Sequence, residues 1–300
     1  MTGAPRYIFT VTAGRSGQAS LTHLVAAHVP GALALHEEPQ VKPVLPRALG
    51  DLERRLRRKF VETHELLGRG DVLRAFAEND REALDTHAAR RQAWLARLAA
   101  RHNAEVVFDV SKYFARGMHC ALAARIGDFN LVLLVRDPIL NMRSFLNRSK
   151  NFYLDNNRPD CPLNELVLDP AHLEPGELYL WAWCEMHLRF TRLVDEFAPA
   201  AAVTIRTKEL EDAGAMARHF TALGLSHGPI ATEPPRNTNA AQGHGPTLVA
   251  ESDVATFERF RDRLPPPILD RIDYFDGYDP RAHPAEPRPT QAPSTTNRKT

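Results

Sequence analysis

The sequence has few cysteines, almost no net charge and no long apolar run. Three cysteines among 300 residues, with no CxxC pair, exclude a disulfide framework and a zinc ribbon. The formal net charge of +1 lacks the basic excess of nucleic-acid-binding proteins, so we expect no nucleic-acid partner. No run is as long as a membrane span, and no signal-peptide pattern opens the chain. We therefore expect a cytoplasmic protein without a membrane partner.

Two familiar hydrolase motifs are missing as well. The stretch HELLG (His64–Gly68) has glycine where the zinc-protease motif HExxH needs its second histidine. The 13 histidines are otherwise scattered, so we expect no metal in the mechanism. No GxSxG turn occurs, which argues against an α/β-hydrolase.

What the sequence does contain is a repeated alternation of strand and helix patterns. Several of its strand-like runs are apolar throughout, as in strands of a parallel sheet that is covered on both faces. These runs alternate with helical patterns, which predicts a three-layer α/β fold: a parallel β-sheet flanked by helices, with right-handed crossovers. The expected strands are Tyr7–Thr12, Ala32–Leu35, Val106–Val110, Leu131–Val135 and Ala202–Ile205.

Two longer segments complete the expected organisation. Residues from about 47 to 102 are rich in Arg, Glu, Leu and Ala, which predicts a helical insertion between two strands. A further helix is expected at Glu177–Phe197. From about Pro280 the chain becomes rich in proline and polar residues, which is typical of a disordered tail. We expect one domain over residues 1–279 and a tail over 280–300.

The stretch YIFTVTAGRSGQASLTHLV begins with the first expected strand, continues through a small-residue turn and ends in a helix. Unbonded N–H groups at a helix start make such a turn an anion site. An ATP-binding loop needs a lysine before its Ser or Thr, but Ala19 stands there, so ATP or GTP hydrolysis is not expected. The other interpretation is an ordinary loop with an exposed arginine. The candidate binding residues are Gly14, Arg15, Ser16, Gly17, Gln18, Ala19 and Ser20.

A second candidate anion site follows the fourth expected strand, in RDPILNMRS. Arg136 ends the strand, and Ser144 lies two helical turns later, so both side chains can reach the same edge of the sheet. The alternative is structural: Asp137 caps the helix and Arg136 is a surface charge.

Together, GRSG after the first strand and VRDP with a serine eight residues after the arginine resemble the sulfotransferases that use 3′-phosphoadenosine 5′-phosphosulfate (PAPS). The resemblance covers roughly Tyr7–Gln242 and implies a P-loop NTPase-like fold. It also implies that the first loop holds the 5′-phosphosulfate, and that Arg136 and Ser144 hold the 3′-phosphate. The family loop usually has Thr where this chain has Gln18, whose amide can still donate a hydrogen bond. A later loop of similar position carries Arg236 and Asn237, which would close the nucleotide site; an ordinary surface loop is the alternative.

The resemblance also suggests catalytic roles. Family members carry a Glu just before a Pro after the second strand; here the sequence is HEEP, which leaves His36, Glu37 and Glu38 as candidate bases. Partial burial and a neighbouring carboxylate are expected to raise the pKa of the glutamate that acts as base. Arg15 and the N–H groups of the turn would stabilise the leaving phosphate. After the third strand, FDVSKYF offers Asp109, Ser111 and Lys112 as acceptor- or sulfuryl-binding residues, or as a solvated loop.

The expected function is PAPS-dependent, in-line transfer of a sulfuryl group to a hydroxyl of a small molecule or glycan, with PAP as product. The walls of the acceptor pocket are expected in residues 51–102 and 150–168. The Ala- and Arg-rich composition favours a bacterial source. Two alternatives stay open. One is a P-loop kinase-like phosphotransferase, for which Asp109 could supply the metal-binding acid. The other is a non-catalytic scaffold that binds PAP.

Overall fold

The computed structural model describes residues 4–39, 49, 52–53, 56, 64–147, 152, 158–232 and 248–282. A five-stranded parallel sheet lies at its centre, with strand order β2-β3-β1-β4-β5. The strands are β1 (Arg6–Val11), β2 (Ala32–His36), β3 (Val106–Val110), β4 (Phe129–Val135) and β5 (Ala201–Arg206). The helices are α1 (Gln18–His28), α3 (His64–Leu67), α4 (Asp71–Ala77), α5 (Arg81–His102), α6 (His119–Ile126), α7 (Pro138–Leu146), α8 (Pro175–Phe197), α9 (Ala213–Ala222), α10 (Glu251–Arg261) and α11 (Pro266–Leu269).

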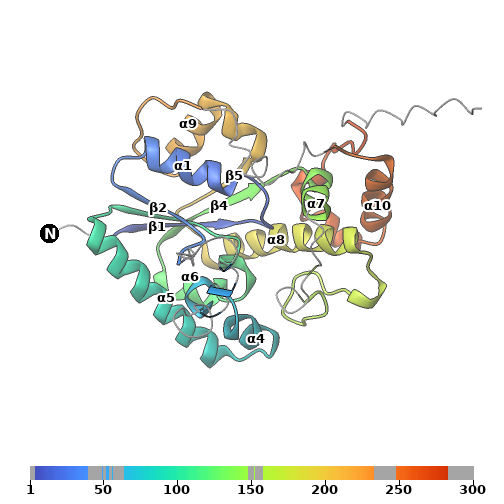
Figure 1. Ribbon diagram of the computed structural model, residues 1–300, viewed down its shortest axis with the longest axis horizontal. Coiled ribbons are helices and arrows are strands. Elements are labelled where there is room, and N and C mark those ends of the chain that lie inside the picture. Colours follow the sequence, from blue (N-terminus) through green and yellow to red (C-terminus); the bar gives the residue numbers. More distant parts are fainter. Residues whose placement is uncertain are drawn as a thin grey trace, which may run out of the picture.

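Helices cover both faces of the sheet (Figure 1). On one face, Ile8 of β1 packs in a core with side chains of α1 and α9, such as Leu24 and Phe220. On the other face, Phe9 lies in a core to which α5, α6 and α8 contribute. Neighbouring residues of one strand thus point into opposite cores, which is why the central strands are apolar at most positions. The expected three-layer α/β fold with a parallel sheet is confirmed.

The strand predictions agree with the structure to within two residues. Val106–Val110 is unchanged, whereas β4 begins at Phe129 rather than Leu131. Asn130 interrupts the apolar pattern there, but its Nδ2 donates to the carbonyl of Leu223 at 3.0 Å, so a polar residue can lie inside the sheet.

The helical insertion between β2 and β3 is confirmed as α3, α4 and α5 within the described residues. Gly68 and Gly70 separate the first two of these helices. Asp80 caps α5 by accepting from Ala83 N at 3.0 Å. Residues 150–151 and 153–157 of the expected pocket wall, and the expected tail from 283 onward, lie outside the described residues.

The arrangement of strands determines where a site can form. In Figure 1 the arrows of β1 and β4 end on the side where α7 lies. Ligands of open parallel sheets bind beyond these carboxyl ends. Among the helices that the structure describes, none combines the length and apolar character needed to cross a bilayer.

Candidate functional site

The turn between β1 and α1 depends on left-handed backbone conformations. Gly14 has φ 93°, Arg15 has φ 61° and Gly17 has φ 91°. A Cβ atom on Gly17 would lie 2.5 Å from Cδ1 of Leu210, so only glycine fits there without displacement. Ser16 Oγ donates to the Gly14 carbonyl at 3.2 Å, which closes the turn.

This turn leaves the first N–H groups of α1 open. The first described backbone bond of the helix runs from Leu21 N to the Gly17 carbonyl at 3.0 Å, and Gly17 provides no side-chain cap. Within the described part of the chain, the N–H groups of residues 17–20 have no acceptor. Such groups, at the positive end of the helix dipole, form an anion-binding cradle.

Arg136 and Ser144 lie beside this cradle. Arg15 Nε donates to Ser144 Oγ at 3.2 Å, and Arg136 Nη1 approaches the Arg15 carbonyl at 3.5 Å. Asn141 Nδ2 donates to the Gly14 carbonyl at 2.8 Å and so ties α7 to the turn. The sequence analysis missed Asn141, although it lies one helical turn before Ser144 and shares its helix face.

The Arg136 guanidinium is suited to an anion. Burial lowers its pKa, while the charge of Asp137 acts in the opposite direction. No ion pair joins Arg136 to a carboxylate among the described residues, because Asp137 instead caps α7 by accepting from Leu140 N at 2.9 Å. Trp183 Nε1 donates to the Arg136 carbonyl at 2.8 Å and fixes the backbone. A partly desolvated cation of this kind gains from an anionic ligand.

The other half of the site centres on Glu37. Lys112 Nζ lies 2.7 Å from its Oε1 and 2.9 Å from its Oε2, and Gln18 Nε2 donates to Oε1 at 3.0 Å. Burial raises the pKa of Glu37, but the Lys112 charge and hydrogen bond, His36 and Gln18 together lower it below its ordinary value. The expectation that the glutamate's pKa would be raised is therefore wrong for Glu37, because its neighbour is an ammonium group.

The three candidate bases differ in their surroundings. β2 ends at His36, and Glu37 adopts φ 51°, a left-handed conformation that is costly for a non-glycine residue. The Glu38 carbonyl accepts from Arg91 Nη1 at 2.7 Å, which holds the loop from the side of α5. Of the three, Glu37 is the residue whose carboxylate contacts Gln18, at the start of the cradle helix.

Two predicted acceptor-binding residues are buried instead. Asp109 is 2% exposed and pairs with Arg91 Nη2 at 2.6 Å, on the face of β3 that α5 covers. Ser111 is 1% exposed, and its Oγ accepts from Tyr113 N at 3.2 Å. Both side chains are buried and bonded within the protein, and direct contact of either with a bound acceptor stays a prediction. Asp109 is paired with Arg91, which disfavours a role as a metal-binding acid.

Two further predictions, the closing loop with Arg236 and Asn237 and the absence of a metal, stay predictions. Arg236 and Asn237 lie outside the described residues. Within the described ranges, no group of three or more His, Cys, Asp or Glu side chains gathers as a metal site.

No protein-family model matches the chain, and no curated protein matches its sequence. Among solved structures, the chain is similar to the sulfotransferase STF9 from Mycobacterium avium at 16% identity and a TM-score of 0.50, over 92% of this chain and 78% of that one. It is also similar to the sulfotransferase domain of the Synechococcus PCC 7002 olefin synthase, at 17% identity and a TM-score of 0.43, over 92% and 95% of the two chains. The similarity to STF9 concerns the fold, and the chain has the fold of a sulfotransferase.

Proposed function

We propose that the chain is a PAPS-dependent sulfotransferase that acts on a hydroxyl group of a small molecule or glycan. One observation carries the proposal: Arg15 of the first turn meets Arg136 and Ser144 of the β4–α7 connection beside a helix start whose N–H groups are open. PAPS has one anionic group at each end of its ribose. A site for it needs two anion-binding elements close together, and the turn and the Arg136–Ser144 pair supply them.

The residues present fit both anionic groups of the donor. The 5′-phosphosulfate would lie on the N–H groups of residues 17–20, with Arg15 at the mouth of the turn. The 3′-phosphate would be held by Arg136, the partly desolvated cation, and by the Ser144 hydroxyl. When bound, PAPS supplies the sulfuryl group that is transferred.

Glu37 is the proposed base. Its lowered pKa keeps the carboxylate ionised near neutral pH, so it can accept the proton of the acceptor hydroxyl. The acceptor oxygen would then form the new bond to sulfur while the bond from sulfur to the 5′-phosphate oxygen breaks, and the electron pair of that bond would stay with the departing PAP. The Lys112 side chain passes beside the turn, since a Cβ atom on Gly14 would lie 3.1 Å from its Cδ. Its ammonium group would therefore balance the charge of the sulfuryl oxygens.

The two alternatives make different predictions. A kinase-like phosphotransferase would need a lysine in the loop and a free metal-binding acid, whereas Ala19 stands in the loop and Asp109 is paired with Arg91. A non-catalytic scaffold would bind PAP without turning over any acceptor.

The test is calorimetric binding of PAP and ADP to the wild type, Arg136→Ala and Arg6→Ala. Arg6 is the matched control, because it bonds the Gly224 carbonyl at the opposite edge of the sheet. We expect PAP to bind more tightly than ADP, and Arg136→Ala to lose about tenfold or more in PAP affinity while Arg6→Ala loses none. Equal binding of ADP, unaffected by Arg136→Ala, would overturn the proposal in favour of a phosphotransferase. Tight PAP binding with no transfer to any of a panel of hydroxyl compounds would favour the scaffold.

A further inference from the structure

A second group of cations lies next to the proposed base. The Lys112 ammonium is 4.6 Å from the ring centroid of Tyr113, and the guanidinium carbons of Arg69 and Arg116 are each 5.1 Å from it. Lys112 also bonds Glu37, so this Tyr113 cluster (Arg69, Lys112 and Arg116 around the ring) begins where the acceptor hydroxyl would be deprotonated. Contacts with one aromatic ring stabilise the cations individually, but they do not neutralise them.

The cluster holds more positive than negative charge. Lys112 is paired with Glu37, whereas the described residues offer neither Arg69 nor Arg116 a carboxylate within ion-pair distance. Nε of Arg69 is buried and has no hydrogen-bond partner. The charges of Glu37, Arg69 and Arg189 act on Arg116, and Arg189 is itself paired with Glu185 at 2.6 Å. Within the described residues, these two guanidinium groups therefore lack a carboxylate partner of their own, an arrangement that costs free energy until an anion binds.

The fold holds these cations in place. Gly68 has φ 89°, and a Cβ atom there would lie 2.9 Å from the Tyr113 carbonyl, so glycine permits the close approach that brings Arg69 to the ring. On the other side, Arg189 Nη1 donates to the carbonyls of Ala115 and Arg116 at 2.6 and 2.9 Å. These buried bonds fix the 3₁₀ turn Phe114–Arg116 and, with it, the position of the Arg116 side chain.

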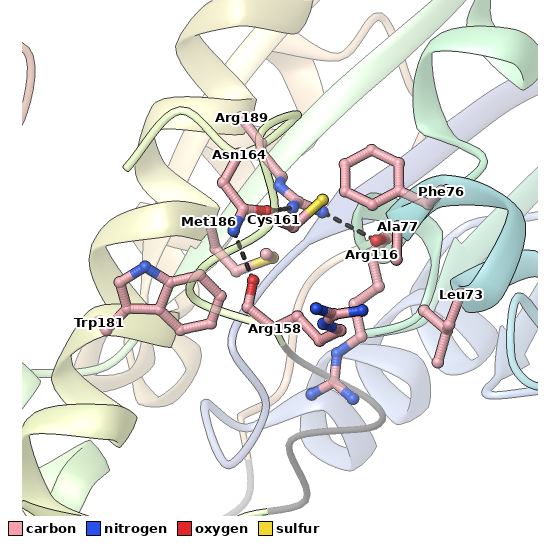
Figure 2. Close-up of a pocket in the computed structure, with 10 residues that line it drawn as sticks. All are labelled: Leu73, Phe76, Ala77, Arg116, Arg158, Cys161, Asn164, Trp181, Met186 and Arg189. Carbon is pink, nitrogen blue, oxygen red and sulfur yellow. Dashed lines mark hydrogen bonds between the residues drawn. The ribbon is translucent and has the colours of Figure 1, made fainter. Parts of the chain in front are cut away.

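Arg116 also lines a small cavity that opens beside the cluster. The cavity has a volume of about 30 Å³, and Figure 2 shows the side chains of Arg116, Arg158 and Asn164 around it, with Trp181 at one side. Space of this size accommodates one polar functional group rather than a whole substrate. Among its lining groups, the Asn164 amide already donates to the Arg158 carbonyl, and Arg158 and Arg189 pair with Asp160 and Glu185. The Arg116 guanidinium is the lining donor that suits an oxygen-rich group.

We propose that the acceptor carries an oxyanion group, such as a carboxylate, sulfate or phosphate, that binds Arg69 and Arg116 while its hydroxyl lies at Glu37. This inference rests on the proposed function and specifies its substrate class. An anionic group relieves the excess charge of the Tyr113 cluster, a neutral group leaves it unchanged, and a cationic group adds to it. The same two arginines would then select the acceptor by charge and place its hydroxyl beside the base.

The test uses three probes of nearly equal shape: benzoate, benzamide and benzamidine, which are anionic, neutral and cationic. Ligand-observed NMR titrations are run with and without saturating PAP, on the wild type, Arg116→Leu, Arg69→Leu and the control Arg74→Leu. Arg74 is 68% exposed in its side chain and pairs with Asp71, away from the ring. We expect wild type and Arg74→Leu to bind benzoate about tenfold or more tightly than benzamide and to bind benzamidine least.

Either cluster variant should lose this preference for benzoate while its PAP affinity stays within twofold of wild type. Arg69→Leu provides the second variant if Arg116→Leu does not fold. Equal binding of benzoate and benzamide by the wild type, or a preference that survives both substitutions, overturns the inference. Because PAP binding is measured separately, failure of the donor site would contradict the proposed function without affecting the benzoate result.

Discussion

At the scale of single residues, the ion pair between Glu37 and Lys112 bears most directly on the proposed chemistry. The lowered pKa of Glu37 means that the carboxylate stays ionised, yet the same ammonium group that ionises it also weakens it as a base. In the proposed reaction, proton transfer to Glu37 would benefit if Lys112 shifted toward the sulfuryl oxygens when the donor binds, because the carboxylate would then regain basicity.

Substituting Lys112 should raise the pKa of Glu37. In Lys112→Met the largest influence that remains is burial, which raises the pKa, so the carboxyl should titrate above its ordinary value of 4.5 rather than below it. NMR titration of carbon-13-labelled glutamate side chains measures this directly, with Lys208→Met as the control for an exposed lysine. A Glu37 pKa that stays low in Lys112→Met would show that Lys112 is not its main partner.

The same pair has a consequence for stability at low pH. A carboxyl whose pKa is lower in the folded than in the unfolded chain adds stability above its unfolded pKa. That stability is lost as the pH falls through the folded pKa. Lys112→Met should lose this contribution near neutral pH and be less sensitive to acid, which urea unfolding at pH 7 and pH 4 would measure. An unchanged pH dependence would argue that Glu37 does not couple to folding.

Some of these residues could be predicted from the sequence and others could not. Arg136 and Ser144 were identified because their spacing of eight lies within one strand-to-helix connection, where local geometry is regular. The sequence could not decide among His36, Glu37 and Glu38. The conformation of the HEEP loop depends on a long-range bond from Arg91, which lies 53 residues after Glu38. Asp109 was placed at the site from its position near the end of a strand, and only the packing of α5 shows that its side chain is buried.

At the scale of elements, the start of α1 depends on Gly17. Ala at a positive φ costs about 1–3 kcal/mol, and the 2.5 Å approach to Leu210 adds about 1–3 kcal/mol of overpacking. Gly127 is the matched control, since it has φ 74° but no atom within 4 Å of a Cβ. We expect Gly17→Ala to lower the free energy of unfolding more than Gly127→Ala does, as measured by urea denaturation. Equal losses of unfolding free energy in the two variants would show that the Leu210 side chain moves aside without destabilising the fold.

A buried ion pair attaches α5 to the sheet and to the loop that carries Glu37. The side chains of Arg91 and Asp109 are 3% and 2% exposed, and Arg91 also binds the Glu38 carbonyl. Arg91→Met leaves the Asp109 carboxylate buried without a partner, so we expect a loss of about 3–5 kcal/mol in the free energy of unfolding. Arg125→Met, which breaks an exposed pair with Asp85, should cost no more than about 1 kcal/mol.

The double variant Arg91→Met/Asp109→Leu separates charge from packing. It removes the unpaired carboxylate, so it should recover a large part of the stability lost in Arg91→Met. Thermal and urea unfolding of the single and double variants provide the comparison. A double variant no more stable than Arg91→Met alone would show that the hydrogen bond to the Glu38 carbonyl, rather than the buried charge, carries the stabilisation.

At the scale of the whole molecule, the side of the sheet where the strands end (the carboxyl edge) and the side where they begin (the amino edge) differ in the groups that they present to a ligand. The carboxyl edge holds the cradle, Arg136 and Glu37, as expected for a parallel sheet. The amino edge holds a cavity of about 400 Å³, lined by residues that include Arg6, Glu105 and Asp128. The two acids there oppose the binding of a highly charged anion.

Hydrogen exchange distinguishes the two edges. The N–H groups of residues 17–20 have no acceptor in the described structure, so they should exchange quickly in the free protein and slow down when PAP binds. We expect PAP to protect peptides covering residues 13–21 and 136–146, and to leave residues 4–8 unchanged in mass spectrometry. Arg136→Ala should weaken both protections, because the 3′-phosphate loses its main cation. Protection at residues 4–8 instead would place the nucleotide in the amino-edge cavity and contradict the site assigned to Arg15 and Arg136.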